Sequence, residues 1–156
     1  SGMYALHHLR EMGLSVRVYD GASDIGGTWW YNRYPGARVD GPGSPFYCYT
    51  FSEELMQEWD WTETQSEQSA VLAYLEHVAD RFDLRRDIQF GTWVQDARYD
   101  EAAQRWTVET STGRYLASAV NRDPRKNSSS AIPLTTVMKT TSHSGPTLEY
   151  SSTRVM

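Results

Sequence analysis

The segment at residues 26–40 combines residue types that could bind a large, flat ligand carrying phosphate groups. It contains two adjacent glycines, four aromatic residues, two arginines and a Pro-Gly turn. Glycine lets the backbone approach a ligand closely, aromatic rings offer flat faces, and arginine presents a rigid fork of donors to phosphate or carboxylate. The alternative is a packed loop whose aromatic side chains fill a core edge. That alternative explains Arg33, Arg38 and Asp40 poorly, because buried charges need partners.

A helix and a short strand must precede this segment and position it. Apolar residues recur at helical spacing over residues 2–12, and Gly13 is a typical helix stop. Val16 and Val18 alternate with Arg17 and Tyr19, which predicts a strand ending at Asp20. A helix, a strand and an acid form the second half of a βαβ unit, whose first strand we expect before residue 1. Without it the strand at 16–20 would keep an unpaired edge, which predicts a marginally stable or aggregation-prone domain.

Gly2 and Asp20 are candidate nucleotide-binding residues of that half-unit. In dinucleotide-binding folds the last glycine of the phosphate loop lies at the helix start. An acid about 20 residues later accepts hydrogen bonds from a ribose. The spacing of Gly2 and Asp20 matches this pattern. Glycines near helix starts and acids after strands are also common in purely structural roles, and the pair alone leaves both interpretations open.

The rest of the first 118 residues predicts further α/β structure. Residues 21–51 are loop-rich, and Ser52 can cap a short helix with acids in its first turn. An amphipathic pattern predicts a helix over residues 69–83 and then a short strand at 88–90. Polar turns separate three antiparallel strands near 92–99, 105–110 and 114–118. The predicted fold class is α/β: a partial Rossmann-type domain, with its first strand missing and a small antiparallel β-meander inserted.

Composition narrows the class of protein. The 156 residues fit one domain, and the formal net charge of −5 argues against a nucleic-acid partner, which would need a basic face. No apolar run approaches the ~18 residues of a membrane-spanning helix. The single cysteine, Cys48, excludes an internal disulfide and suits a reducing, cytoplasmic setting. The four histidines lack metal-ligand spacing, so no metal site is predicted.

Residues 46–49 and residues 119–156 each have an unusual composition. Alternating aromatic residues at 46–49 favour a half-buried strand, and nothing near Cys48 in the sequence would activate its thiol. Residues 121–156 contain seven Ser, six Thr and one aromatic residue, whereas the preceding 120 residues contain nineteen aromatic residues. We therefore expect residues 119–156 to be a Ser/Thr-rich tail that is disordered or foreign to the domain at 1–118.

Five separated motifs in residues 1–118 have a recognisable order. They are GGTWWYNRYPGARVD, FYCYTFSEEL, EWDWTE, YLEHVADRFDL and RWTVET. Together they resemble the N-terminal part of the flavin-dependent Baeyer–Villiger monooxygenases, of the phenylacetone and cyclohexanone monooxygenase types. The resemblance implies one Rossmann-type domain for FAD and another for NADPH. It also implies a reaction in which a flavin C4a-peroxide, formed with O2, inserts oxygen beside a ketone carbonyl and gives an ester or lactone.

The resemblance assigns a series of contacts to FAD. Gly2 resembles the last glycine of the FAD phosphate loop, and Asp20 resembles the acid that binds the adenosine ribose. The segment that lies along the cofactor after the double glycine is matched by Gly26, Gly27, Thr28, Trp29, Trp30 and Tyr31.

Further positions resemble the family's sites closer to the chemistry. Arg38, Val39 and Asp40 match the stretch where FAD and NADPH meet, and Asp40 resembles a supporting catalytic acid near the flavin. Tyr47 matches a tyrosine that contacts the flavin, and Val94 matches a strand residue near the adenine.

The sequence also departs from the family pattern. The resemblance ends after residue 118, and the family's Phe-x-Gly…His…Trp-Pro cluster, its NADPH domain and its catalytic arginine are absent. We therefore expect the chain to be an inactive N-terminal fragment of such an enzyme. The alternatives are a flavin monooxygenase acting on nitrogen or sulfur and a non-catalytic remnant of an FAD-binding domain. A plain NAD dehydrogenase is favoured less, because its fold does not call for the aromatic segment.

Overall fold

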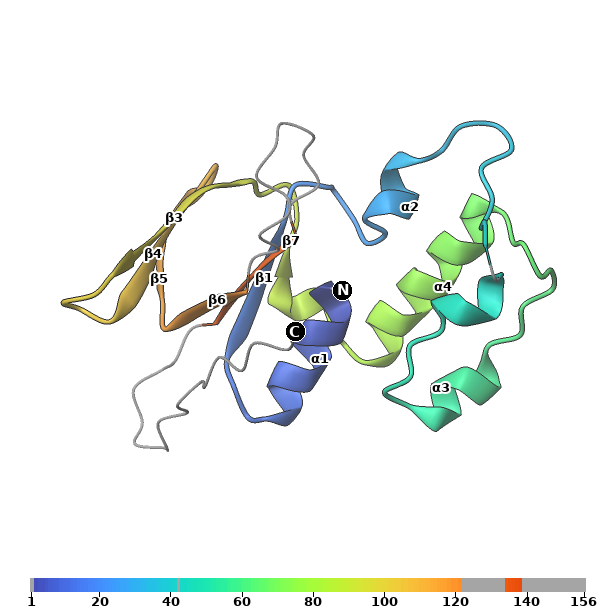
Figure 1. Ribbon diagram of the computed structural model, residues 1–156, viewed down its shortest axis with the longest axis horizontal. Helices are drawn as coiled ribbons and strands as arrows, with labels where there is room; N and C mark the ends of the chain where they lie inside the picture. Colours follow the sequence, from blue (N-terminus) through green and yellow to red (C-terminus); the bar gives the residue numbers. More distant parts are fainter. Residues whose placement is uncertain (1, 42, 122–133, 139–156) are drawn as a thin grey trace, which may run out of the picture.

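The computed structural model describes residues 2–41, 43–121 and 134–138. A four-stranded sheet of order β2-β1-β7-β6 lies at the centre, flanked by helices on one side and by a three-stranded sheet, β3-β4-β5, on the other (Figure 1). The helices are α1 (Gly2–Glu11), α2 (Thr28–Tyr31), α3 (Glu53–Glu58) and α4 (Gln68–Arg81), with 3₁₀ turns η1 (Ser44–Tyr47) and η2 (Arg85–Asp87). The strands are β1 (Val16–Asp20), β2 (Ile88–Gln89), β3 (Val94–Asp100), β4 (Arg105–Thr110), β5 (Gly113–Ala117), β6 (Ala119–Asn121) and β7 (Leu134–Met138).

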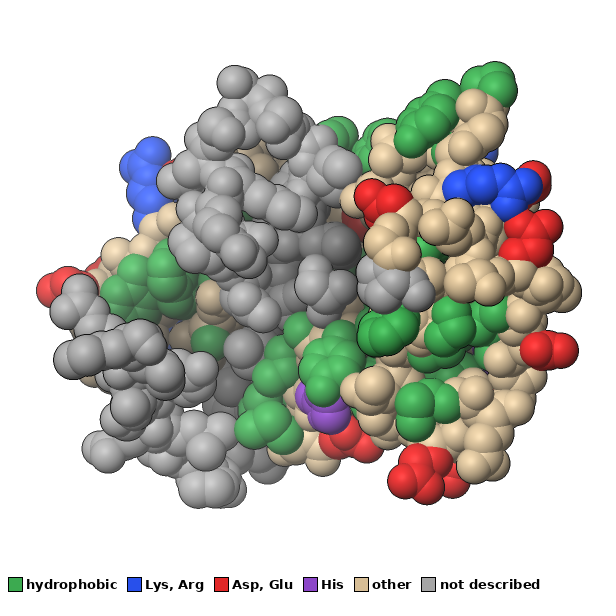
Figure 2. Space-filling view, turned by 45° about the vertical axis from the view of Figure 1, so that its right-hand side comes forward, with side chains coloured by type: hydrophobic (Ala, Val, Ile, Leu, Met, Phe, Trp, Pro, Cys, Tyr) green, Lys and Arg blue, Asp and Glu red, His purple; other side chains and the backbone are tan. Residues whose placement is uncertain are grey.

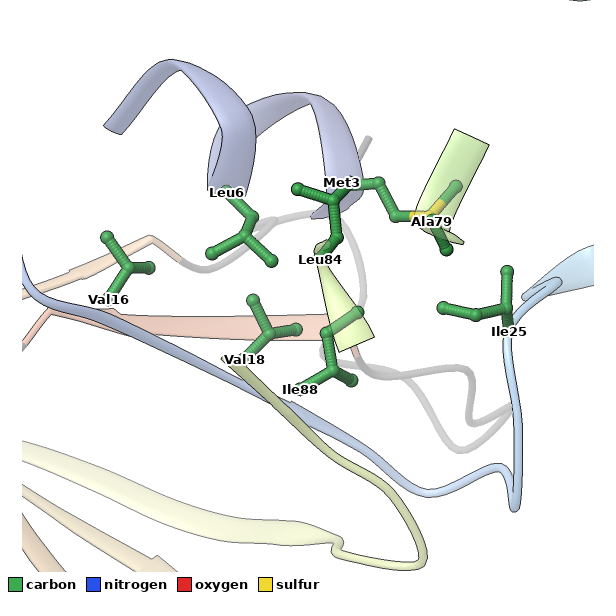
Figure 3. Close-up of a cluster of buried hydrophobic side chains, with 8 residues drawn as sticks. All are labelled: Met3, Leu6, Val16, Val18, Ile25, Ala79, Leu84 and Ile88. Atoms are coloured by element: carbon green, nitrogen blue, oxygen red, sulfur yellow. The ribbon is translucent and has the colours of Figure 1, made fainter. Parts of the chain in front are cut away.

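The first helix and strand form as the sequence predicts. Leu6 of α1 is fully buried, and Val16 and Val18 of β1 face it across the first hydrophobic cluster (Figure 3). Ile88 contributes from β2, which runs parallel to β1, and Leu84 contributes from the segment between α4 and η2. This apolar contact fixes α1 on one face of the sheet and therefore sets where its N-terminus lies.

The other side of β1 is paired, contrary to the expectation of an open edge. Strand β7 runs antiparallel to β1 over five register positions, from Val16 opposite Met138 to Asp20 opposite Leu134. Strand β6 then pairs with β7. Three of the five β7 residues are β-branched, which favours a strand, and β1 offers unpaired backbone groups.

Strands β6 and β7 thus lie within residues 119–156, the stretch that we expected to be disordered or foreign to the domain. Residues 122–133 and 139–156 lie outside the described residues. The origin of the tail, and the domain boundary at residue 118, stay predictions.

The predicted meander is present as β3, β4 and β5. Both pairings are antiparallel, and the inner face carries Val108 and Ala117, which are almost fully buried. Tyr19 of β1 packs into this second cluster, with its ring 5.0 Å from that of Tyr115. The meander therefore covers the face of β1 opposite to α1.

Helices α3 and α4 contribute to a third cluster, which is largely aromatic. Leu55, Tyr74 and Val78 are fully buried, and the rings of Trp59 and Trp61 pack around Tyr74. The hydroxyl of Ser52 accepts a hydrogen bond from the Leu55 N–H at 3.2 Å, which is the predicted helix cap. In the expected loop, two short turns appear, α2 and η1.

The prediction of a half-buried strand at 46–49 is wrong. Residues Ser44–Tyr47 form a 3₁₀ turn with Pro45 near its start, and Phe46 is 76% exposed. Proline presets the backbone for such a turn and cannot donate to a strand ladder. The aromatic alternation therefore reflects contacts with other elements rather than a sheet face.

Candidate functional site

One cavity of about 420 Å³ brings together candidate residues from distant parts of the chain. It lies where α1 begins and where the parallel strands β1 and β2 end, which is the edge at which open α/β sheets bind ligands. Seven of the thirteen predicted cofactor-binding residues line it: Gly2, Asp20, Gly26, Gly27, Thr28, Trp29 and Tyr47. Apart from Asp20, the side chains among these seven are uncharged or absent. The cavity therefore offers backbone donors, flat rings and one acid.

Asp20 is the charged group of this cavity. It is 4% exposed, and its Oδ1 accepts a hydrogen bond from the Ala22 N–H at 2.9 Å. Burial raises the pKa of the Asp20 carboxyl, and the Ala22 hydrogen bond opposes that rise. Asp20 shares its face of β1 with Val16 and Val18, so it points to the same side of the sheet as α1. Its second oxygen is available to accept from a hydroxyl in the cavity.

Gly26 and Gly27 form one wall, and both have backbone conformations that favour glycine. Gly26 has φ +138°, and a Cβ placed on it would lie 2.6 Å from Leu72 Cδ1 and 2.9 Å from the Trp30 nitrogen. Gly27 has φ +53°, and a Cβ there would meet nothing within 4 Å. Gly26 is therefore required by packing against α4, whereas Gly27 leaves free space beside the cavity.

Replacing Gly26 by alanine is expected to destabilise the protein by about 1–3 kcal/mol, because it combines backbone strain with a clash against Leu72 and the Trp30 backbone. Gly27→Ala is the matched control, with an expected cost of about 1 kcal/mol because only the left-handed conformation is disfavoured. Urea unfolding monitored by tryptophan fluorescence measures both. Equal losses for the two variants would contradict the close approach of Gly26 to α4.

The opposite wall consists of residues 46–49, which form hydrogen bonds with Tyr74 of α4 and with Trp61. The Tyr49 N–H donates to the Tyr74 hydroxyl at 2.7 Å, and the indole N–H of Trp61 donates to Cys48 Sγ at 3.1 Å. Burial raises the pKa of Tyr49 to about 12 and also raises the pKa of Tyr74, so both phenols are neutral at physiological pH. The Trp29 ring meets the Tyr47 ring edge-on at 5.6 Å and connects the two walls.

Three of the predicted residues lie away from the cavity. Trp30 is covered by the Arg33 guanidinium, 4.0 Å from its ring centre, and Tyr31 is 45% exposed. Val94 packs in the meander cluster with Tyr19 and Val108, on the other face of β1.

Figure 2 shows hydrophobic side chains gathered over the helical half of the visible face, with acidic side chains around its rim.

The residues Arg38, Val39 and Asp40 also lie outside the cavity. Arg38 forms ion pairs with Glu63 and with Glu67, at 2.7 Å for the latter, and these partners raise the pKa of its guanidinium. Val39 is buried, and Asp40 is exposed. The predicted meeting place of two cofactors is therefore a separate surface, on which the arginine already has carboxylate partners.

Sequence reasoning missed the apolar floor of the cavity. This floor includes Met3, Val18, Ile25, Leu75, Ile88 and Phe90. Except for Ile25, which lies in the expected loop, these residues belong to predicted helices and strands. Ile88 lies in β2 and Phe90 directly follows it, at the same edge of the sheet where β1 ends, and this position is a signal that could have identified them.

Within the described ranges, no group of three or more His, Cys, Asp or Glu side chains could hold a metal ion. No helix in the described part of the chain is long and apolar enough to cross a membrane.

The chain is similar to known proteins in both sequence and fold. Residues 1–60 match the model of the NAD(P)-binding Rossmann-like domain family. The chain is 48% identical over 113 residues to an acetone monooxygenase (methyl acetate-forming) of Gordonia sp. (strain TY-5), with 72% of this chain and 21% of the relative covered. It is 47% identical over 126 residues to the phenazine N-monooxygenase PhzNO1 of Lysobacter antibioticus, with 77% and 23% covered. A solved structure of oxidized steroid monooxygenase bound to NADP is 50% identical, with a TM-score of 0.71 over 78% of this chain and 25% of that one.

The fold and the cavity define a Rossmann-type nucleotide-binding domain of the α/β class, as predicted. Its relatives are flavin monooxygenases, among them Baeyer–Villiger and cyclohexanone monooxygenases at 46% and 40% identity. The chain is thus homologous to the Baeyer–Villiger class of flavin-dependent monooxygenases, which confirms the resemblance read from its motifs. It spans about a fifth of the length of the curated relatives that it matches.

Proposed function

We propose that this chain forms part of the FAD-binding site of an FAD- and NADPH-dependent monooxygenase that converts ketones into esters or lactones with O2. The observation that carries the proposal is the convergence of Gly2, Asp20 and the segment at 26–29 on one cavity. They come from the start of α1, the end of β1 and the loop that leads into α2, and they have the residue types that a nucleotide cofactor requires. The names of the relatives supply the chemical class.

The residues present fit FAD. The N-terminus of α1 at Gly2 offers backbone N–H groups to a phosphate, and the buried Asp20 carboxylate can accept from a ribose hydroxyl. The open space at Gly27 admits a close backbone approach, and Trp29 with Tyr47 offers ring faces and edges. Bound FAD would supply the redox chemistry and the activation of oxygen. The chain's own part is to hold that cofactor and to exclude water with its apolar floor.

The NADPH contact at Arg38, Val39 and Asp40 belongs to the same proposal. Because Arg38 already pairs with Glu63 and Glu67, a phosphate or carboxamide that engages it must compete with two carboxylates. Asp40 is exposed and can support an arginine elsewhere in the enzyme. The free thiol of Cys48 suits a cytoplasmic setting, and the negative net charge suits a small-molecule substrate rather than a nucleic acid.

A flavin titration tests the proposal. We expect the purified 156-residue chain to quench FAD fluorescence with a saturable curve, and to bind FAD more tightly than riboflavin because of the α1 N-terminus. We also expect no ketone-dependent NADPH oxidation from this chain alone, because it spans a fifth of its relatives' length. If neither FAD nor riboflavin shows saturable quenching, the proposed FAD site is refuted.

Oxygenation of a ring nitrogen is a second candidate. It is favoured by the 47% identity to a relative named as a phenazine N-monooxygenase. Product analysis of an enzyme that contains this chain, supplied with NADPH and with either a ketone or a phenazine, separates the two. An N-oxide as the sole product would favour the second candidate, and an ester or lactone would favour the first.

A further inference from the structure

Gln68, the first residue of α4, contacts the cavity wall from outside. Its side-chain Nε2 donates a hydrogen bond to the Trp29 carbonyl oxygen. Trp29 lines the cavity, and its ring contacts Tyr47 on the opposite wall. Gln68 itself is not among the cavity-lining residues, so it can act on the site only through the residues that it holds.

The backbone of Gln68 contacts a second part of the same segment. Its N–H donates to the Ala37 carbonyl at 2.9 Å, and next to it the Val39 N–H donates to the Ser66 carbonyl at 3.0 Å. Between Trp29 and Ala37 the chain runs through exposed residues such as Tyr34, which is 63% exposed. Gln68 therefore joins the two ends of an otherwise exposed loop.

The helix α2 needs such support because it has only four residues. Helices this short are not stable by themselves, and the last carbonyl groups of any helix lack partners within it. The Thr28 carbonyl is satisfied by the Asn32 N–H, and the Trp30 carbonyl by Arg33 Nε. The Trp29 carbonyl accepts from Gln68, which is the donor contributed by α4.

We propose that Gln68 is a positioning residue of the cavity, which holds α2 and Trp29 in place through its side-chain amide. The inference rests on the proposed FAD site for its functional consequence, although its structural part applies to the protein without flavin. Its side chain and backbone together fix the two ends of the loop at residues 29–37.

The test uses Gln68→Glu, which keeps the shape and removes the N–H donor. Gln57→Glu on α3 is the matched control, because Gln57 is exposed and the charge change is the same. In the flavin-free chain we expect faster amide hydrogen exchange at residues 30–32 for Gln68→Glu and no change for Gln57→Glu. Gln68→Lys restores a donor and is expected to restore slow exchange. In the FAD titration, Gln68→Glu is expected to bind about tenfold more weakly.

The outcomes separate this inference from the proposed function. Unchanged exchange at residues 30–32 in Gln68→Glu would overturn the positioning role. Faster exchange spread equally over α1 and β1 would also overturn it, because that result indicates general destabilisation. If the unmodified chain binds no FAD, the proposed function fails while the exchange data still decide the role of Gln68.

Discussion

Replacing Leu6 by alanine is expected to lower the free energy of unfolding by about 2–5 kcal/mol. Leu6 is 0% exposed and lies between α1 and the sheet, in contact with the cluster that includes Val16, Val18 and Ile88. Removal of its side chain leaves a cavity that the β-branched neighbours cannot fill. Since small domains have about 5–15 kcal/mol in total, this single change would remove a large fraction of it.

Urea unfolding of Leu6→Ala and of Leu116→Ala measures this effect. Leu116 on β5 is 54% exposed, so its truncation is expected to change stability by at most about 0.5 kcal/mol. Because Leu6 holds α1, whose N-terminus lines the cavity, FAD affinity should fall with stability in Leu6→Ala. Similar midpoints for the two variants would show that α1 does not pack as described.

The Asp20→Asn variant is expected to bind FAD about 10–100-fold more weakly, because a hydrogen bond to a charged acceptor contributes roughly 1.5–3 kcal/mol. Asparagine keeps the oxygen that accepts from the Ala22 N–H, so the backbone at the end of β1 is retained. Fluorescence titration with FAD measures the loss. Asp60→Asn, at an exposed position, is the matched control for the charge change.

The same substitution should increase stability near neutral pH. Burial raises the pKa of Asp20 in the folded state, so the folded protein binds that proton more tightly than the unfolded chain does. The ionised carboxyl therefore destabilises the fold above its folded-state pKa, and the destabilisation is relieved as the pH falls through that value. Asp20→Asn should melt at a higher temperature than the unmodified protein near pH 7, with a difference that shrinks in acid. A lower melting temperature of Asp20→Asn at neutral pH would contradict the conclusion that the buried, ionised Asp20 carboxylate destabilises the fold.

The sequence by itself determined the elements whose pattern is local. Helix α1, strand β1, helix α4 and the three meander strands lie within one or two residues of their predicted bounds. Each has an apolar repeat of 3.6 or 2, and glycine or polar residues bound most of them. The motif order also identified the flavin monooxygenase class, because it depends only on residue identity along the chain.

Only the tertiary structure decided which candidates share a cavity. Gly2, Asp20 and Trp29 meet because α1 packs on β1 and α4 supports α2, and these contacts depend on residues far away in the sequence. Contacts of the same long-range kind pair Arg38 with Glu63 and Glu67 and place Val94 behind the sheet. Strand β7 forms within a Ser/Thr-rich stretch, where the edge of β1, more than a hundred residues earlier in the chain, supplies the hydrogen-bond partners.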